Sequence, residues 1–232
     1  MKVNELRLPG SSKGLLRAER GNGRVNTDIV LELENITKRF PGVVALDDVN
    51  ISIWGGEVHA LLGENGAGKS TVVNIIAGVH QPDAGRILLE GQPVRFNTPE
   101  ESLAHGIAFI YQELTLLPSL SVAENIFVGR LPRRRSLPVV DWNELRARAK
   151  EVLGRIGLDL DPEIPVRYLS TGLQQQVEIC RALALDPKIL VMDEPTSALT
   201  EHEVERLFDT VRTLSAAGLT VIFISHRLEE VR

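Results

Sequence analysis

The chain has 232 residues, of which 26 are Lys or Arg, 31 are Asp or Glu, and 43% are hydrophobic. This composition is typical of a globular protein and excludes disordered, collagen-like and disulfide-scaffold classes. The net charge of −5 gives no reason to expect a nucleic-acid partner, and the single Cys180 cannot form an internal disulfide.

The first part of the chain predicts a leader followed by short strands. Residues 1–28 are rich in glycine and charge and show no helical or strand period, so we expect a loose leader there. Alternating polar and apolar residues then predict strands at 30–34 and 49–53, and a third strand at 58–62 enters a glycine-rich stretch. Apolar residues between Val72 and Ile76 predict a helix directly after it.

Later helices are marked by residues that cap a helix N-terminus. A Ser, Thr or Asp followed three residues later by Glu marks four such starts: Thr98/Glu101, Ser121/Glu124, Asp141/Glu144 and Thr200/Glu203. Extended apolar segments recur at 107–111, 188–192 and 219–224. Short strands alternating with helices predict an α/β domain with a mostly parallel sheet.

Strand patterns are missing between about 113 and 182, where helix patterns dominate. We therefore expect a helical sub-domain at 113–182, inserted into a sheet-bearing body formed by 29–112 and 183–232. Residues 227–231 predict the start of a new helix just before the chain stops at Arg232, so we expect a domain cut before its last strands.

A phosphate-binding motif lies between the predicted strand 58–62 and the helix that follows. Residues 63–70, Gly-Glu-Asn-Gly-Ala-Gly-Lys-Ser, fit the pattern G-x-x-x-x-G-K-[ST] in the context that it requires. The glycines let backbone N–H groups converge on phosphate oxygens, and the helix start adds unsatisfied donors. We expect Lys69 to reach the β- and γ-phosphates and Ser70 to ligate Mg²⁺. The nucleotide-binding candidates in this stretch are Gly63, Asn65, Gly66, Gly68, Lys69, Ser70 and Thr71.

Two acidic residues end an apolar strand about 120 residues downstream. Asp193 is placed to hold Mg²⁺ through water, and Glu194 to polarise an attacking water molecule. Together with the glycine-rich loop, this pair predicts a site for a nucleoside triphosphate and Mg²⁺, with Lys69 and Glu194 as catalytic residues.

From about Val30 to Arg232 the sequence resembles the nucleotide-binding domain of an ABC transporter, because further motifs occur in that family's order. The resemblance implies a P-loop NTPase (RecA-like) core, an antiparallel β region near the N-terminus and an inserted helical sub-domain. It implies that Phe40 stacks on adenine, that Gln112 contacts Mg²⁺ or water, and that His226 contacts the γ-phosphate as a catalytic residue.

Residues 169–173, Leu-Ser-Thr-Gly-Leu, occupy the position of the family's LSGGQ signature. The resemblance implies that Ser170 and Gly172 contact a γ-phosphate bound to the opposing subunit of a head-to-tail dimer. Thr171 replaces a glycine and Leu173 replaces a glutamine, which puts the strength of this half-site in doubt. Thr200 stands where Asp is more usual in the family.

Longer stretches at 34–46, 56–71 and 225–231 are similar to ATP-binding subunits of bacterial monosaccharide importers of the ribose, xylose and galactose group. Those subunits usually carry two fused halves, which implies that this chain is the N-terminal half. The implied protein hydrolyses ATP at the cytoplasmic face of the cell membrane and powers sugar import. Its implied partners are a second nucleotide-binding domain, a membrane permease and, indirectly, a solute-binding protein, with no nucleic acid.

Seven apolar residues after Gln112 are candidates for the permease contact, although a role in the sub-domain core fits them equally well. They are Leu114, Leu116, Leu117, Leu120, Val122, Ile126 and Phe127. Two other functions share the nucleotide motifs: a soluble ABC ATPase acting on ribosomes or DNA, and a non-hydrolysing nucleotide sensor. A P-loop kinase is the weakest alternative, since it explains neither the helix start at Ser170 nor the Ser225-His226 pair.

Overall fold

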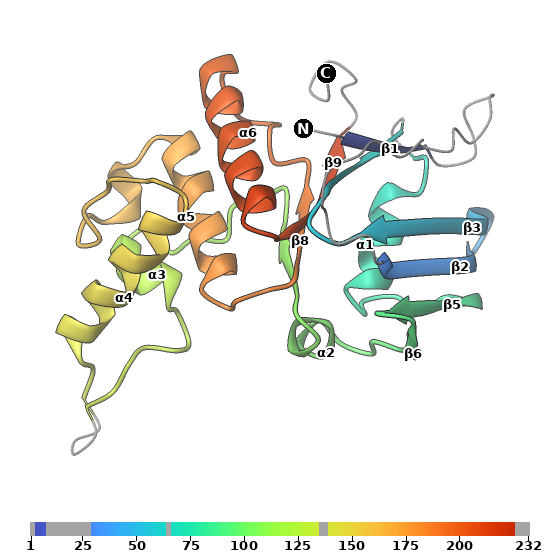
Figure 1. Ribbon diagram of the computed structural model, residues 1–232, viewed down its shortest axis with the longest axis horizontal. Helices are drawn as coiled ribbons and strands as arrows, with labels where there is room; N and C mark the ends of the chain where they lie inside the picture. Colours follow the sequence, from blue (N-terminus) through green and yellow to red (C-terminus); the bar gives the residue numbers. More distant parts are fainter. Residues whose placement is uncertain (1–2, 8–28, 64–65, 135–138, 226–232) are drawn as a thin grey trace. The chain divides into compact units, whose positions relative to one another are not determined.

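The computed structural model describes residues 3–7, 29–63, 66–134 and 139–225. They divide into two compact units. The first unit comprises residues within 1–109, 187–194 and 215–232, and the second comprises 110–186 and 195–214. Figure 1 labels the helices and strands of both units.

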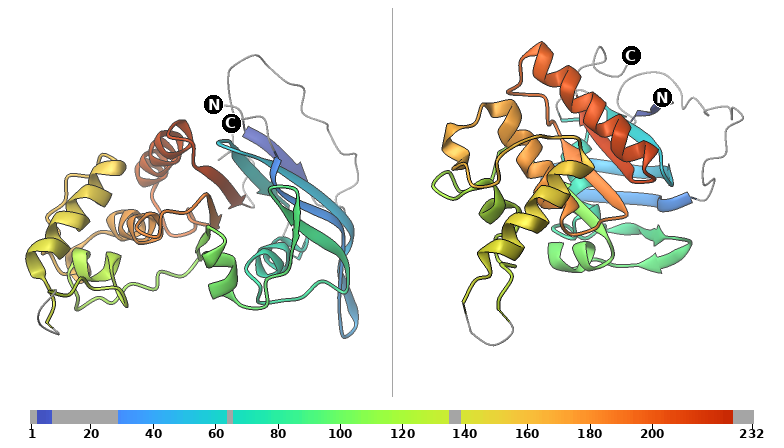
Figure 2. Two further views of the ribbon diagram at one scale, coloured as in Figure 1. Left: turned by 60° about the horizontal axis from the view of Figure 1, so that its bottom comes forward. Right: turned by 60° about the vertical axis from the view of Figure 1, so that its left-hand side comes forward.

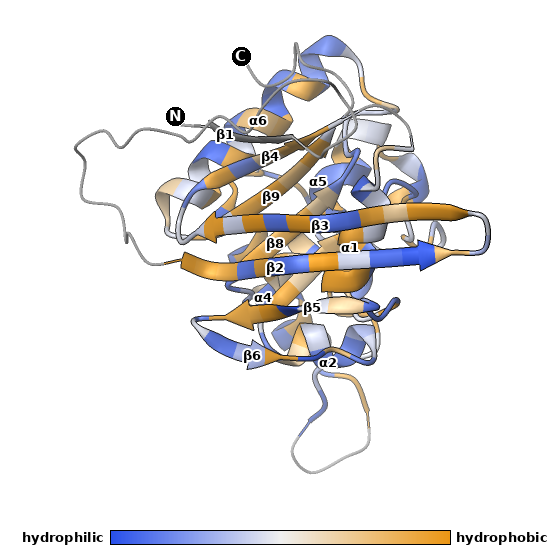
Figure 3. Cartoon of the chain, turned by 90° about the vertical axis from the view of Figure 1, so that its right-hand side faces the viewer, coloured by the Kyte–Doolittle hydropathy of each residue, from blue (hydrophilic) through white to orange (hydrophobic). Residues whose placement is uncertain are grey.

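A mostly parallel sheet forms the centre of the first unit, with strand order β1-β4-β9-β8-β7. Its strands are β1 (Val3–Arg7), β4 (Val58–Leu62), β7 (Ile107–Ile110), β8 (Ile189–Asp193) and β9 (Thr220–Ser225). Strand β9 pairs in parallel with β4 on one side and β8 on the other. Strands β8 and β9 are hydrophobic along almost their whole length, as expected for strands buried on both faces (Figure 3). This arrangement confirms the predicted α/β class.

A second, antiparallel sheet of the first unit has strand order β3-β2-β5-β6. Its strands are β2 (Ile29–Phe40), β3 (Val43–Trp54), β5 (Ala84–Leu89) and β6 (Gln92–Val94). The sequence predicted only residues 30–34 of β2 and 49–53 of β3, and it did not predict β5 or β6. Register shifts explain the short predictions, because bulges between Leu33 and Lys38 interrupt the alternation that a regular strand shows. Asn35, at φ 52°, lies within this irregular stretch.

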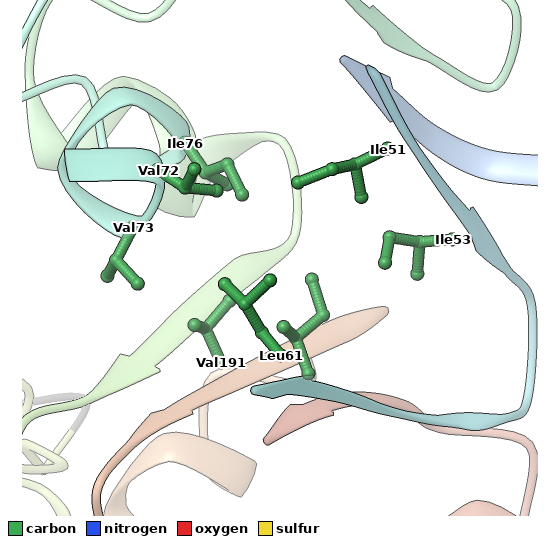
Figure 4. A pocket seen from close by; sticks show the side chains of 8 residues that line it. Ile51, Ile53, Leu61, Val72, Val73, Ile76 and Val191 are labelled. Carbon is green, nitrogen blue, oxygen red and sulfur yellow. The ribbon is translucent and has the colours of Figure 1, made fainter. Parts of the chain in front are cut away.

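Helix α1 (Lys69–Ile76) packs between the two sheets. The left view of Figure 2 shows it against one face of the antiparallel sheet, and Figure 4 shows side chains from both sheets and the helix turned toward one small cavity. The residues that line this cavity are all apolar: Ile51, Ile53, Leu61, Val72, Val73, Ile76, Val191 and Ile222. Helix α2 (Pro99–Ala104) begins where predicted, with the Thr98 side chain accepting from the Glu101 N–H.

The second unit is helical over its described residues. Its elements are α3 (Val122–Ile126), α4 (Trp142–Arg155), a 3-10 turn (Val166–Tyr168), α5 (Thr171–Leu183) and α6 (Glu201–Ala216). The predicted caps are present at Ser121 and Asp141, and Ser121 and Glu124 form a complete capping box. No helix in the described part of the chain is long and apolar enough to cross a membrane.

Two predicted boundaries differ from the structure. The expected leader at 1–28 contains a strand, since residues 3–7 form β1 and pair in parallel with β4, while 8–28 lie outside the described residues. The five residues of β1 do not alternate regularly between polar and apolar types, so no sequence pattern predicts this strand. Parallel pairing with β4 determines the strand instead. In addition, α6 belongs to the second unit, whereas the sequence placed it in the sheet-bearing body.

The fully buried His59 lies in the middle of β4. Its ring stacks on Trp54 with 5.6 Å between centroids, and its Nε2 accepts from the Trp54 N–H at 3.0 Å. Burial lowers the pKa of His59 from 6.5 to about 4, because the imidazolium would lose its hydration there. The folded protein therefore keeps this side chain neutral at physiological pH.

This burial predicts a loss of stability in mild acid. The unfolded chain takes up a proton on His59 near pH 6.5 and the folded chain only near pH 4, so acid favours the unfolded state across that interval. Between pH 7.5 and 4 we expect His59 to lower the free energy of unfolding by about 3 kcal/mol. Urea unfolding of the parent and of His59→Gln, which retains an acceptor but does not titrate, measures this contribution. Parallel pH curves for the two proteins would contradict it.

Candidate functional site

The carboxyl ends of three neighbouring strands bring the candidate residues of the first unit to one edge of the parallel sheet. Leu62, which ends β4, is the register partner of Ser225, which ends β9. Asp193, which ends β8, is the register partner of Ile224. The glycine-rich loop follows β4, and Glu194 follows β8, so the loop and both acidic residues emerge from the same edge. Ligands of open parallel sheets bind at such edges.

The glycine-rich loop has a backbone that only glycine accommodates without strain. Gly66 and Gly68 have φ angles of 84° and 89°, in the left-handed region. A Cβ on Gly68 would also lie 2.6 Å from the carbonyl oxygen of Ala45, whereas one on Gly66 would meet nothing within 4 Å. Gly68 is therefore required both by its conformation and by close packing against β3. The predicted ligand Asn65 lies outside the described residues.

Lys69, Ser70 and Thr71 form the first turn of α1. The Lys69 side chain is buried, and its Nζ donates to the carbonyl oxygen of Gly63 at 2.7 Å, back across the loop. Ser70 is exposed and Thr71 is half-buried. This turn thus presents a buried cation, a hydroxyl and the N–H groups of a helix start, which are the donors that phosphate groups bind.

Asp193 and Glu194 are half-buried. Burial raises the pKa of Asp193, and the negative charge of Glu194 raises it further, against the opposing effect of Lys69. Glu194 has φ 45°, a conformation rare for a residue with a side chain, and its N–H donates to Ile224 at 3.1 Å. The strained backbone turns the chain sharply directly after β8.

The donor set at this edge fits a hard divalent cation. Mg²⁺ prefers oxygen ligands, and Ser70 and Asp193 supply a hydroxyl and a carboxylate. Burial and the nearby charge of Glu194 disfavour the ionised form of Asp193, and a bound cation would stabilise that form. Among the described residues no cluster of three or more His, Cys, Asp or Glu forms a metal cage of protein ligands alone.

Phe40 ends β2 at the tip of the β2–β3 hairpin, opposite Val43. Its half-buried ring meets the His80 ring edge to face at 5.3 Å, and the Lys38 Nζ lies 5.5 Å from its centroid. Ala45, two residues beyond Val43, is the residue that Gly68 approaches. The hairpin tip therefore lies near the glycine-rich loop, and a stacking role for Phe40 stays a prediction.

Ser170 and Gly172 lie at the N-terminus of α5 in the second unit. Ser170 is the N-cap, and its Oγ accepts from the Leu173 N–H at 3.4 Å. Thr171 and Leu173, which replace the usual glycine and glutamine, are part of a regular first turn. A Ser hydroxyl and first-turn N–H groups, which have no backbone partner within the helix, suit a bound anion.

A carboxylate that the sequence did not assign to the site lies at this helix end. Glu203 Oε1 accepts from the Gly172 N–H at 3.0 Å and from Ser170 Oγ at 3.2 Å. Its Oε2 accepts from the N–H and hydroxyl of Thr200 at 3.1 and 2.9 Å. The Thr200 and Gly172 N–H groups and the two hydroxyls lower the pKa of Glu203. The capping pattern Thr200/Glu203 predicted that Glu203 contacts Thr200. Only the fold reveals its contacts with Ser170 and Gly172.

Gln112 is exposed and lies in the second unit, two residues beyond β7. His226 lies outside the described residues, directly after the buried Ser225 that ends β9. Their predicted contacts with Mg²⁺ and the γ-phosphate stay predictions.

The parallel sheet, the glycine-rich loop and the following helix define a P-loop NTPase domain. The family model described as ABC transporter matches residues 46–197. The chain therefore belongs to the ABC transporter family.

Similar curated proteins include the ribose import ATP-binding protein RbsA 2 of Streptomyces avermitilis, which is 55% identical over 87% of this chain. A second is the putative ribose/galactose/methyl galactoside import ATP-binding protein 1 of Agrobacterium fabrum, 52% identical over 90% of the chain. The chain spans about 40% of the length of these relatives, 40% of the first and 41% of the second.

Solved structures with the same fold include the ADP conformation of an ATP-binding cassette of an ABC transporter. It has a TM-score of 0.77 and 32% identity, covering 88% of this chain and 84% of that one. CbiO1 from Clostridium perfringens, part of the ABC transporter complex cbiONQ, has a TM-score of 0.75 and 29% identity, covering 88% and 81%. These matches confirm the predicted family and the P-loop NTPase fold.

Two glycines of the loop differ in a way that stability measurements can test. We expect Gly68→Ala to lower the free energy of unfolding by roughly 3 kcal/mol or more, because it adds an overlap with Ala45 to a left-handed backbone. The matched variant Gly66→Ala has only the backbone cost, about 1 kcal/mol. Urea unfolding without nucleotide measures both, and equal losses would refute the proposed packing against β3.

Proposed function

We propose that this chain is the ATP-binding and ATP-hydrolysing domain of an importer for a monosaccharide. The observation that carries the proposal is the shared edge of β4, β9 and β8, which places the glycine-rich loop beside Asp193 and Glu194. The names of the relatives, which describe sugar import ATP-binding proteins, support the transport function and the cargo class. They favour it over a soluble ATPase acting on ribosomes or DNA.

Binding of ATP depends on the first unit. Lys69 releases the Gly63 carbonyl and pairs with the β- and γ-phosphates, while the N–H groups of the loop and of the first turn of α1 surround the phosphate oxygens. Phe40, at the hairpin tip, stacks on the adenine. Ser70, Asp193 and Gln112 would hold Mg²⁺, which neutralises phosphate charge when bound.

Hydrolysis is an in-line displacement at the γ-phosphorus. Glu194 orients a water molecule and accepts its proton as the new oxygen–phosphorus bond forms. The bond from the γ-phosphorus to the bridging oxygen breaks, and that oxygen leaves with ADP. Lys69 and His226 stabilise the charge on the transferring group.

A second nucleotide-binding domain completes the site in this proposal. The two domains bind head to tail, and Ser170 and Gly172 of each cover the γ-phosphate held by the loop of the other. In the full protein a fused second half is the expected partner. The domain lies at the cytoplasmic face of the membrane, bound to a permease that receives sugar from a solute-binding protein.

Burial reduces the number of apolar residues after Gln112 that are available to contact a permease. Leu116, Val122, Ile126 and Phe127 are buried, so they form the core of the second unit rather than a docking surface. Leu117 is 46% exposed and remains a candidate. The fully buried Asn125 side chain fixes the loop that carries Leu117. Asn125 Oδ1 accepts from the Leu117 N–H at 2.7 Å, and Asn125 Nδ2 donates to the Leu117 carbonyl oxygen at 3.0 Å.

Replacing the proposed base separates hydrolysis from binding. In the full-length transport complex we expect Glu194→Gln to lower the ATPase rate at least about 100-fold, because an amide cannot accept the proton from water. ATP affinity should not fall, since removing the charge of Glu194 removes a repulsion with the phosphates. Phosphate release and nucleotide titration measure the two quantities, and an unchanged ATPase rate would show that Glu194 is not the base.

Lys69→Ala tests the phosphate-binding loop. Loss of a buried ammonium that pairs with two phosphates should weaken ATP binding by about tenfold or more, measured by calorimetry. Lys188→Ala is the matched control in the same unit, since Lys188 is exposed and pairs with Glu90 at 2.6 Å. We expect the control to bind ATP like the parent. Equal affinity for Lys69→Ala and the parent would reject the assignment of the loop.

A further inference from the structure

The N-terminus of α5 already holds an anion that belongs to the chain itself. Glu203 Oε1 lies 3.0 Å from the Gly172 nitrogen and 3.2 Å from Ser170 Oγ, the two groups that cover the γ-phosphate in the proposed function. A Cβ built on Gly172 would lie 2.5 Å from the same oxygen, so the carboxylate fills the space directly over this glycine. A phosphate oxygen bound by both groups would need that position.

Two anions cannot share these donors. A hydroxyl has one proton to donate, and the Ser170 proton goes to Glu203 while its oxygen accepts from Leu173. A γ-phosphate beside an ionised Glu203 would meet like charge at contact distance, where repulsion is strongest. The lowered pKa of Glu203 means that the carboxylate stays charged at neutral pH.

We propose that the Glu203 carboxylate is an internal occupant of the γ-phosphate site at α5, which the nucleotide must displace when two domains close. This inference rests on the proposed function of Ser170 and Gly172. It makes Glu203 an autoinhibitory group that raises the ATP concentration required for closure.

Displacement is a local movement of one side chain. Helices α5 and α6, coloured orange and red in Figure 2, are joined through the buried pair of Thr210 Oγ1 and Gln176 Oε1 at 3.1 Å. This contact lies almost two turns from Glu203 along α6, so the helices can stay packed while the carboxylate rotates. Its other oxygen remains available to the N–H and hydroxyl of Thr200.

The same side chain connects the phosphate site with the segment that follows Glu194. Thr200 ends the stretch 195–200 that leads from the proposed base to α6, and its two donors hold Oε2 of Glu203. Release of Oε1 by a γ-phosphate leaves Thr200 as the remaining hydrogen-bond partner of this carboxylate. Thr200 carries no charge and supplies this carboxylate with its backbone N–H and its hydroxyl.

The test measures closure of the full-length protein in its membrane complex, in a Glu194→Gln background that keeps ATP unhydrolysed. Spin labels on the two nucleotide-binding halves report their distance as ATP and Mg²⁺ are added. We expect Glu203→Gln to lower the half-maximal ATP concentration about threefold and Glu203→Ala about tenfold, because a neutral amide competes less and a methyl group not at all.

Glu201→Gln is the matched control, since it removes the same charge from the first turn of α6 without the Oε1 contacts to Ser170 and Gly172. We expect its titration to coincide with that of the parent. A purely structural role for Glu203 predicts the opposite sign, with lower melting temperature and weaker closure. An unchanged or higher ATP requirement in both Glu203 variants, or an equal shift in Glu201→Gln, would overturn the proposal.

Ser170→Ala distinguishes failure of this inference from failure of the proposed function. If Ser170→Ala raises the ATP requirement while the Glu203 variants do nothing, the phosphate site stands and the internal occupant is wrong. If Ser170→Ala and the Glu203 variants all leave closure unchanged, α5 does not contact phosphate, and the proposed composite site fails with the inference.

Discussion

The parallel register of β4, β9 and β8 is the constraint on which the rest of the first unit depends. Parallel strands all end at the same edge, so residues far apart in sequence meet there. The glycine-rich loop begins directly after β4, and the acidic pair Asp193 and Glu194 lies at the end of β8. Burial of all three strands stabilises this arrangement, since apolar side chains on both faces of the sheet pack into the core.

At that edge the chain accepts local strain and unfavourable burial. Glu194 adopts a left-handed backbone, Asp193 keeps its carboxyl where burial disfavours ionisation, and Gly68 lies against a carbonyl oxygen of β3. The same edge holds the buried ammonium of Lys69. Sites that bind or react commonly deviate from local structural preferences, while the surrounding core supplies the stability.

Much of this could be predicted from the sequence, because the patterns involved are local. The loop motif, the apolar strands β4, β8 and β9, and the caps at Thr98, Ser121 and Asp141 each occupy a few consecutive residues. Strand β1 and the bulged half of β2 could not, since partners distant in sequence determine them. The contact of Glu203 with Gly172 joins residues 31 apart and leaves no periodic pattern.

The raised pKa of Asp193 has a consequence for how the site responds to its surroundings. A carboxyl that is reluctant to ionise binds a proton more readily than an ordinary aspartate, and a proton and a divalent cation compete for the same oxygens. Acid would therefore protonate Asp193 more readily than an exposed aspartate and weaken its hold on a cation.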